Sequence, residues 1–213
     1  MTLKSNIIAS IVCVTKRRTF LDELLLNFSN QKYPCLEFIV VLHGFQPDDE
    51  FIRKCDGLSV KYIVMDKRFS FGHALNMGFL HSQGDFKFKF DDDDIYASNY
   101  VENSMMTFSQ AGSSVSVVGR KDIFWLLTET SDFFIRRLRY AHLVGASIAF
   151  KRCVLRKVCF ERLDKGEDSQ FLSSCSLLGM KVDCNNAKDL CAVRYGSSHH
   201  TWRVEYREIF KYE

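Results

Sequence analysis

Segments typical of strands and of helices alternate along the first half of this chain. Residues 7–14 form a β-branched apolar run that predicts a buried strand, and residues 19–31 follow with apolar side chains at helical spacing. Further strands are predicted at 36–43, 60–65 and 86–90, and further helices at 71–82 and 98–108. This alternation predicts an α/β fold with a mostly parallel central sheet that helices cover on both faces.

The second half of the chain is less regular. Strands are predicted at 114–119, 122–128 and 145–150, and a helix is predicted at 169–179. At the start of the first helix, Thr19 and Asp22 have the spacing of a capping box. The length of 213 residues, with two prolines and no linker-like stretch, predicts one domain over 1–213.

Composition and charge exclude one class of partner and indicate the cellular compartment of the protein. The formal net charge of +3 lacks the concentrated basic character of a nucleic-acid binder, so no nucleic-acid partner is expected. Eight cysteines without a CxxC pair indicate reduced, buried thiols. The N-terminal apolar run is too short to span a bilayer and lacks a small-residue cleavage site, which predicts a cytoplasmic protein.

Four consecutive aspartates, Asp91 to Asp94, follow directly on the predicted strand at 86–90. Ligands of open α/β sheets bind beyond the carboxyl ends of the strands, where this run is expected to lie. Adjacent carboxylates raise one another's pKa unless a cation neutralises them, and hard oxygen ligands suit Mg²⁺ or Mn²⁺ together with a diphosphate. A solvated acidic turn is the alternative. In an extended chain, Asp91 and Asp93 would share one face, and Asp92 and Asp94 the other.

The segment "GDFKFKFDDDDIYASNYVE" resembles the aspartate-rich segment that ends a central strand in family 2 glycosyltransferases of the GT-A fold. Residues 10–44 are similar to the family's first strand, helix and second strand, and residues 71–85 to a later helix. Residues 145–172 and 199–202 resemble its Glu-Asp loop and the segment that returns a histidine to the metal. The resemblance implies a GT-A fold with a nucleotide-binding half over about 1–97 and an acceptor-side half over about 98–213.

The resemblance also implies a metal site for Mn²⁺ or Mg²⁺. Asp93 is expected as the direct protein ligand, with Asp94 helping to orient the site. His200 is expected as the second ligand, with His199 as its competitor for that role. The assignment within the aspartate run is open by one position.

Other positions are expected to contact the nucleotide-sugar or to act on the acceptor. The contacts implied by the resemblance are Thr15, Arg17, Asn76, Asp91, Asp92 and Glu167, with Asp91 or Asp92 directed toward the ribose. Asp168 matches the general base of the Glu-Asp motif, which takes a proton from the acceptor hydroxyl. The alternative for Asp168 is a carboxylate that stabilises the start of a helix, and the alternative for Arg17 is an exposed basic turn.

The implied reaction is inverting transfer of a sugar from a nucleotide donor, a UDP-sugar being favoured, to a hydroxyl of a cell-surface glycan or a lipid-linked acceptor. One rival is a GT-A-like partner subunit that has lost catalysis. It is supported by Leu42 or His43, one of which replaces the family's base-contacting aspartate. The other rival is a sugar nucleotidyltransferase, which should carry a glycine-rich basic loop that residues 14–20 lack.

Two further segments depart from the expected pattern. Lys87 and Lys89 alternate with phenylalanines where relatives have apolar residues, so that face of the strand is expected to reach water, a phosphate or a carboxylate such as Asp91. Phe133 to Tyr140 mixes aromatic and basic side chains. This segment is expected either to lie peripherally on the inner face of the cytoplasmic membrane or to form an amphipathic helix on its own domain.

Overall fold

The computed structural model describes residues 8–137 and 143–195, and its main sheet has seven strands. They are β1 Ala9–Thr15, β2 Leu36–His43, β3 Lys61–Met65, β4 Phe86–Phe90, β6 Val115–Gly119, β9 Ala149–Lys151 and β10 Lys181–Cys184. Their order is β10-β6-β9-β4-β1-β2-β3. Neighbours run parallel except at β9, which is antiparallel to both β4 and β6. The predicted mostly parallel sheet is confirmed.

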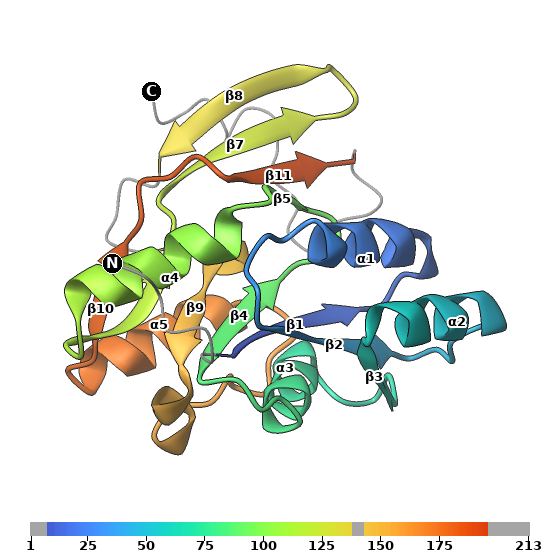
Figure 1. The fold of residues 1–213 in the computed structure, drawn as a ribbon, viewed down its shortest axis with the longest axis horizontal. Coiled ribbons are helices and arrows are strands. Elements are labelled where there is room, and N and C mark those ends of the chain that lie inside the picture. Colours follow the sequence, from blue (N-terminus) through green and yellow to red (C-terminus); the bar gives the residue numbers. More distant parts are fainter. Residues whose placement is uncertain (1–7, 138–142, 196–213) are drawn as a thin grey trace.

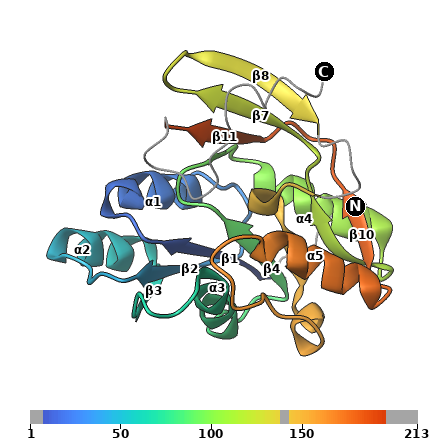
Figure 2. The same cartoon turned by 180° about the vertical axis from the view of Figure 1, so that it is seen from behind.

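Helices cover both faces of this sheet, as Figures 1 and 2 show from opposite sides. The α-helices of the described residues are α1 Leu21–Ser29, α2 Asp49–Leu58, α3 Phe71–Leu80, α4 Tyr100–Ala111 and α5 Glu167–Leu177. In β1, Ile11 and Cys13 join the core cluster that contains α1, α2 and α4, whereas Val12 and Val14 join the cluster of α3 and α5. Side chains of successive strand residues point to opposite faces, so both faces of β1 are buried.

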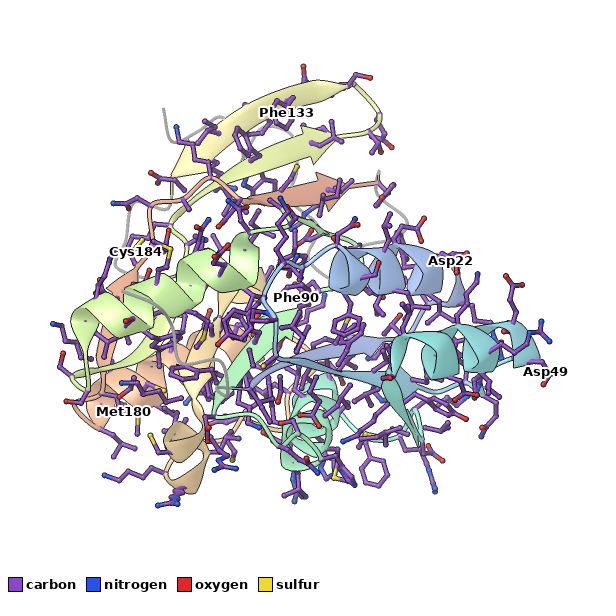
Figure 3. All side chains as sticks on the ribbon, in the orientation of Figure 1. Asp22, Asp49, Phe90, Phe133, Met180 and Cys184 are labelled. Atoms are coloured by element: carbon purple, nitrogen blue, oxygen red, sulfur yellow. The ribbon has the colours of Figure 1, made fainter. Side chains whose placement is uncertain are left out.

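A second, smaller sheet lies beyond α1 and α4, at the top of Figure 1. Its strands, in spatial order, are β5 Ile95–Tyr96, β11 Leu190–Arg194, β7 Asp122–Leu127 and β8 Asp132–Arg137. Ile123 and Trp125 of β7 belong to the core, while Phe124 stacks on Phe133 of β8 with ring centroids 5.0 Å apart. Figure 3 places Phe133 on this outer hairpin and Phe90, the last residue of β4, near the middle of the molecule.

The predictions for the first two connections need correction. The capping box of Thr19 and Asp22 is wrong, because a 3-10 helix occupies Arg18–Phe20 and α1 begins after Phe20 without a side-chain cap. Helix α2 was not predicted at all. Its signal is nevertheless in the sequence, since the Asp48 side chain accepts a 2.8 Å hydrogen bond from the Phe51 amide and two acidic residues follow in the first turn.

The segments around the second sheet also differ from expectation. The amphipathic helix proposed as one alternative for residues 133–140 is wrong for the part that the structure describes, because 132–137 is strand β8, paired in register with β7. Phe133 and Ile135 are exposed and Phe134 is half-buried, which is the period-two pattern of a strand. The predicted strand at 145–150 is reduced to β9, because its first residues form a 3-10 turn.

All eight cysteines are free thiols. Cys13, Cys55 and Cys175 are buried, but Cys153 and Cys159 are exposed, so the prediction of buried thiols is wrong for these two. Among the residues described, no helix is both long and apolar enough to cross a membrane. Strands from both predicted halves of the domain pair in the main sheet, and the division into halves stays a prediction.

Candidate active site

The four aspartates form a turn at the carboxyl end of β4, where the chain leaves the main sheet for β5. The amide of Asp91 donates to the Tyr96 hydroxyl at 2.9 Å, and that hydroxyl donates to the carbonyl of Ala146 at 2.8 Å. The side chain of Asn27 donates to the carbonyl of Asp94 at 2.8 Å and accepts from the amide of Tyr96 at 3.0 Å. The alternation of faces expected for an extended run therefore does not apply.

Asp92 and Asp93 share one protein cation. The Arg17 guanidinium contacts Asp92 through Nη2 and Nε, the latter at 3.2 Å from Oδ2, and Nη2 lies 3.1 Å from Asp93 Oδ2. The Thr15 hydroxyl also donates to Asp92 Oδ2, at 2.5 Å. Burial raises the pKa of Asp92, and the Arg17 guanidinium and the Thr15 hydroxyl oppose that rise. Arg17 also lies over the ring of Phe20, 4.3 Å from its centroid.

Asp94 faces away from Arg17 and toward the second sheet. Its Oδ1 accepts from the amide of Val193 and from Arg194 Nη1, each at 3.2 Å. Burial raises the pKa of Asp94 to about 7, and the positive charge of Arg194 limits that rise. The Arg194 guanidinium is held over the ring of Trp125, 4.7 Å from its centroid. The last strand of the described chain thus completes the site from one hundred residues away.

Lys89 joins the aspartate turn to α5. Its Nζ lies 2.5 Å from Asp91 Oδ1 and 3.2 Å from Asp168 Oδ2, and the side chain is almost fully buried. The pairing of Lys89 with Asp91 is as predicted. Burial raises the pKa of Asp168 to about 7, opposed by Lys89 and reinforced by Glu167 and Asp91. The two carboxylates hold the pKa of Lys89 well above its usual range, although burial alone would lower it.

Lys87 behaves differently from the prediction. Its side chain is fully buried and its Nζ donates to Ser82, at 2.9 Å to the carbonyl and 2.6 Å to the hydroxyl. The expectation that this face of the strand reaches water, a phosphate or a carboxylate is therefore wrong at Lys87. A backbone carbonyl and a hydroxyl supply the polar partners that a buried ammonium requires.

The charges of the aspartate turn are balanced in large part by the protein itself. Five carboxylates, Asp91 to Asp94 and Asp168, are paired with three cations, Arg17, Lys89 and Arg194. A metal is thus not the only cation that neutralises the run, because arginine and lysine side chains already pair with it. An excess of negative charge remains, and it adds to burial in raising the pKa values of Asp92, Asp94 and Asp168.

The side chains at the aspartate turn suit Mn²⁺ or Mg²⁺ only in part. Over 8–137 and 143–195, no group of three or more His, Cys, Asp or Glu side chains is placed to hold a metal ion. Asp93 fits the role by its chemistry, because these ions commonly bind one or two carboxylates and complete their shell with phosphate oxygens and water. The Arg17 guanidinium also shows that the space between Asp92 and Asp93 accepts positive charge. His199 and His200, together with Trp202, lie outside the described residues.

Two predicted nucleotide contacts lie on the helices beside the turn. Glu167 is buried at the start of α5, next to Asp168. The side-chain amide of Asn76 on α3 donates to the carbonyl of Phe160 at 2.7 Å and accepts from the amide of Phe160 at 2.9 Å. Its contact with a nucleotide stays a prediction. His43 is buried at the end of β2, and its Nε2 lies 2.8 Å from the carbonyl of Phe69.

Four positions that contact the candidate site were not predicted from the sequence. They are Asn27, Tyr96, Gly145 and Arg194. Asn27 and Arg194 reach Asp94 from distant parts of the chain, and Gly145 lies against Asp168. Tyr96 is only five residues from Asp91, but it belongs to no motif with its own spacing.

The sequence model of glycosyl transferase family 2 matches residues 10–153. The fold is similar to that of the mannosyltransferase PcManGT from Pyrobaculum calidifontis in complex with GDP-Man and Mn²⁺, at 19% identity and a TM-score of 0.66, over 90% of this chain and 57% of that one. It is also similar to a TarS fragment from S. aureus in complex with UDP-GlcNAc, at 14% identity and a TM-score of 0.67, over 90% and 60%. This chain thus spans less than two thirds of either neighbour, and no curated protein sequence matches it. The predicted GT-A fold is confirmed.

Proposed function

Because this chain belongs to glycosyl transferase family 2, we propose that it transfers a sugar from a nucleotide-sugar donor to a hydroxyl group, with inversion at the anomeric carbon. The observation that carries this proposal is the link from the aspartate turn through Lys89 to Asp168. An in-line displacement needs a base on the acceptor side and charge stabilisation at the leaving diphosphate. Asp168 is suited to the first task because its pKa lies near neutrality and 23% of its side chain is exposed to an incoming acceptor.

On the donor side, we propose Asp93 and His200 as ligands of Mn²⁺ or Mg²⁺. The metal would stabilise the negative charge that develops on the leaving diphosphate. The proposed contacts to the nucleotide-sugar are Thr15, Arg17, Asn76, Asp91, Asp92 and Glu167. The solved neighbours hold GDP-Man with Mn²⁺ in one case and UDP-GlcNAc in the other. We favour a UDP-sugar as the donor here.

On the acceptor side, we propose a cell-surface glycan or a lipid-linked oligosaccharide. Phe133 and Ile135 expose 60% and 45% of their surface on the outer hairpin, which offers apolar contact area to a membrane or a lipid carrier. Peripheral attachment to the inner face of the cytoplasmic membrane through Phe133 to Tyr140 is part of the same proposal. Residues 138–140 of that segment lie outside the described residues.

A second candidate is a partner subunit that keeps the fold without catalysis. It is favoured by one observation, that Arg17 already occupies the carboxylates of Asp92 and Asp93. Metal-dependent release of UDP from UDP-GlcNAc, or of GDP from GDP-mannose, distinguishes the two. A catalytic domain releases nucleotide with water as a slow acceptor, whereas a partner subunit does not.

The proposal is tested by thermal unfolding with UDP, GDP, CMP or dTDP, each with and without Mn²⁺. Ligands that bind only the folded state raise the melting temperature by mass action. We expect one nucleotide to stabilise the protein, and only in the presence of Mn²⁺. If a well-folded sample responds to none of them, the donor site proposed here is refuted and the partner-subunit candidate takes its place.

A further inference from the structure

Lys89 occupies the central strand on the face that carries α5. It pairs in register with Val12 of β1, and its amide donates to the carbonyl of Ile148 at 2.9 Å, so main-chain bonds hold it from both sides. Only 1% of the residue is exposed. The strand therefore fixes where the ammonium lies, and the ammonium has little freedom to follow a partner that moves.

Asp168 approaches Lys89 from the first turn of α5, over Gly145. A Cβ atom added at Gly145 would lie 2.1 Å from Asp168 Oδ2 and 2.8 Å from its Cγ, so the carboxylate occupies the space that any other residue would fill. Asp168 Oδ2 is thereby held against Lys89 Nζ, while Oδ1 has no hydrogen-bond partner. Two unrelated features, a lysine and a missing side chain, set the same carboxylate in one orientation.

We infer that Lys89 is a positioning residue for the reaction, which holds the carboxylate of Asp168 against Gly145 in the orientation that receives the proton of the acceptor hydroxyl. This inference rests on the proposed function of Asp168 as the base. In the reaction the acceptor oxygen forms its bond to the anomeric carbon, its proton passes to the carboxylate of Asp168, and the diphosphate leaves with the electron pair of the broken bond. Lys89 keeps its proton throughout.

A purely structural role for the pair of Lys89 and Asp168 predicts a different rate and pH dependence for variants at Lys89. If Lys89 served only to fill the core, a methionine of similar length would preserve the rate and its pH dependence in every molecule that folds. If Lys89 positions Asp168 and favours its ionised form, its removal moves the ascending limb of the pH-rate profile to higher pH. Asp91 and Glu167 also face Asp168, and both would push the limb in that same direction once Lys89 is gone.

The experiment compares Lys89→Met with Lys87→Met, a control on the same face of the same strand that is also almost fully shielded from solvent and donates its hydrogen bonds to Ser82. The rate of UDP release from UDP-GlcNAc, or of GDP release from GDP-mannose, is measured with Mn²⁺ from pH 5 to pH 10. We expect Lys89→Met to release nucleotide at least about tenfold more slowly at pH 7, and its rate to recover at high pH. The ascending limb of its pH-rate profile should lie at least about one pH unit higher. Lys87→Met should keep the limb of the parent protein, and so should Lys89→Arg.

Two further variants keep the inference testable if Lys89→Met does not fold. Gly145→Ala displaces Asp168 while leaving Lys89 and Asp91 in place, so it should slow the reaction and move the limb as Lys89→Met does. A limb at the parent position in Gly145→Ala, or in a folded Lys89→Met, would overturn the inference. Carboxyl ¹³C NMR, with the Asp168 signal identified by its loss in Asp168→Asn, gives the same comparison without turnover.

The outcomes separate this inference from the proposed function. If Asp168→Asn releases nucleotide at the parent rate, Asp168 is not the base and the proposed mechanism fails with the inference. If Asp168→Asn is inactive but Lys89→Met behaves like Lys87→Met, the proposed function stands and only the inference fails.

Discussion

The two buried lysines of β4 share a strand and a face but have different partners. Lys87 and Lys89 are two residues apart, point to the same face and are almost fully shielded from solvent. Burial lowers the pKa of Lys87 to about 8, because its partners are neutral oxygens of Ser82. The pKa of Lys89 is instead raised, since the carboxylates of Asp168 and Asp91 outweigh its desolvation. Burial alone therefore does not determine the charge state of a lysine; the groups around its ammonium do.

The two lysines also lie at opposite ends of strand β4. Lys87 lies at the amino end of β4, where the chain enters the sheet and its side chain returns to the preceding loop. Lys89 lies at the carboxyl end, beside the aspartate turn. In open parallel sheets the carboxyl ends carry the ligand site. The same residue type is thus a structural group at one end and part of the candidate site at the other.

The largest expected effect comes from removing the carboxylate of Asp168, which Lys89 contacts. Asp168→Asn should slow sugar transfer by about 10²–10⁴-fold, the usual contribution of a general base. The variant should be as stable as the parent or more stable by about 1–2 kcal/mol at pH 7. Rate and thermal unfolding are measured on the same sample.

The sign of that stability effect follows from the raised pKa of Asp168, about 7. The folded protein binds the proton of Asp168 more tightly than the unfolded chain does, so ionised Asp168 disfavours folding. The penalty is absent below the unfolded pKa of about 4 and complete above about 7. The gain from Asp168→Asn should therefore grow between these pH values, and a gain that shrinks with rising pH would contradict this account.

The next largest effect is the loss of stability when Lys89, the partner of Asp168, is removed. Lys89→Met leaves the carboxylates of Asp91 and Asp168 close together without their shared cation. Removing one partner of a buried ion pair typically destabilises a protein by about 3–5 kcal/mol. Urea unfolding at pH 7 measures the loss. A change within the error of the parent value would mean that the two acids take up protons instead, and the loss should then appear at high pH.

Lys87→Met is expected to act in the opposite direction and more weakly. The lowered pKa of Lys87, about 8, means that its charge disfavours folding below that pH. The penalty decreases from pH 8 to the unfolded pKa near 10.4 and is absent above it. Methionine removes the charge but leaves the oxygens of Ser82 without a donor, so we expect a net stabilisation of about 1 kcal/mol at pH 7. Equal destabilisation by both lysine substitutions would remove the contrast between the two sites.

The smallest expected effect concerns a third cation, Arg17, which is more accessible to solvent than either lysine. The Arg17 side chain is 25% exposed and contacts Asp92 and Asp93, between which a metal would compete with it. Arg17→Gln should tighten binding of Mn²⁺ to the nucleotide-free protein by about fivefold, the equivalent of about 1 kcal/mol. Titration followed by electron paramagnetic resonance measures the free Mn²⁺. Arg18→Gln is the control, and unchanged affinity in Arg17→Gln would show that Arg17 does not compete.

The order of the elements in the first half could be predicted from the sequence because each strand and helix carries its own apolar period. The aspartate turn, Asp168 and the pairing of Lys89 with Asp91 were also within reach, because they lie in motifs or are two residues apart. Helix α2 was missed although its cap is visible at Asp48.

The rest of the site depends on contacts that no local pattern records. Asn27 and Arg194 bond to Asp94 across 67 and 100 residues of chain, and Gly145 is required only because Asp168 lies on it. In the second sheet only β7 was predicted. β5 has two residues, too few to establish a period, and the mixture of aromatic and basic residues in β8 was interpreted as a membrane contact or an amphipathic helix.

The position of Arg194 in the chain has a consequence for synthesis on the ribosome. The cations that pair with Asp91, Asp92 and Asp93 all precede the aspartate turn, so they are present as soon as the turn emerges. The partner of Asp94 is translated one hundred residues later, on the strand that also pairs with β5. We therefore expect Asp94 to stay hydrated or protonated in the nascent chain until β11 emerges, and the aspartate turn to become fixed late in folding.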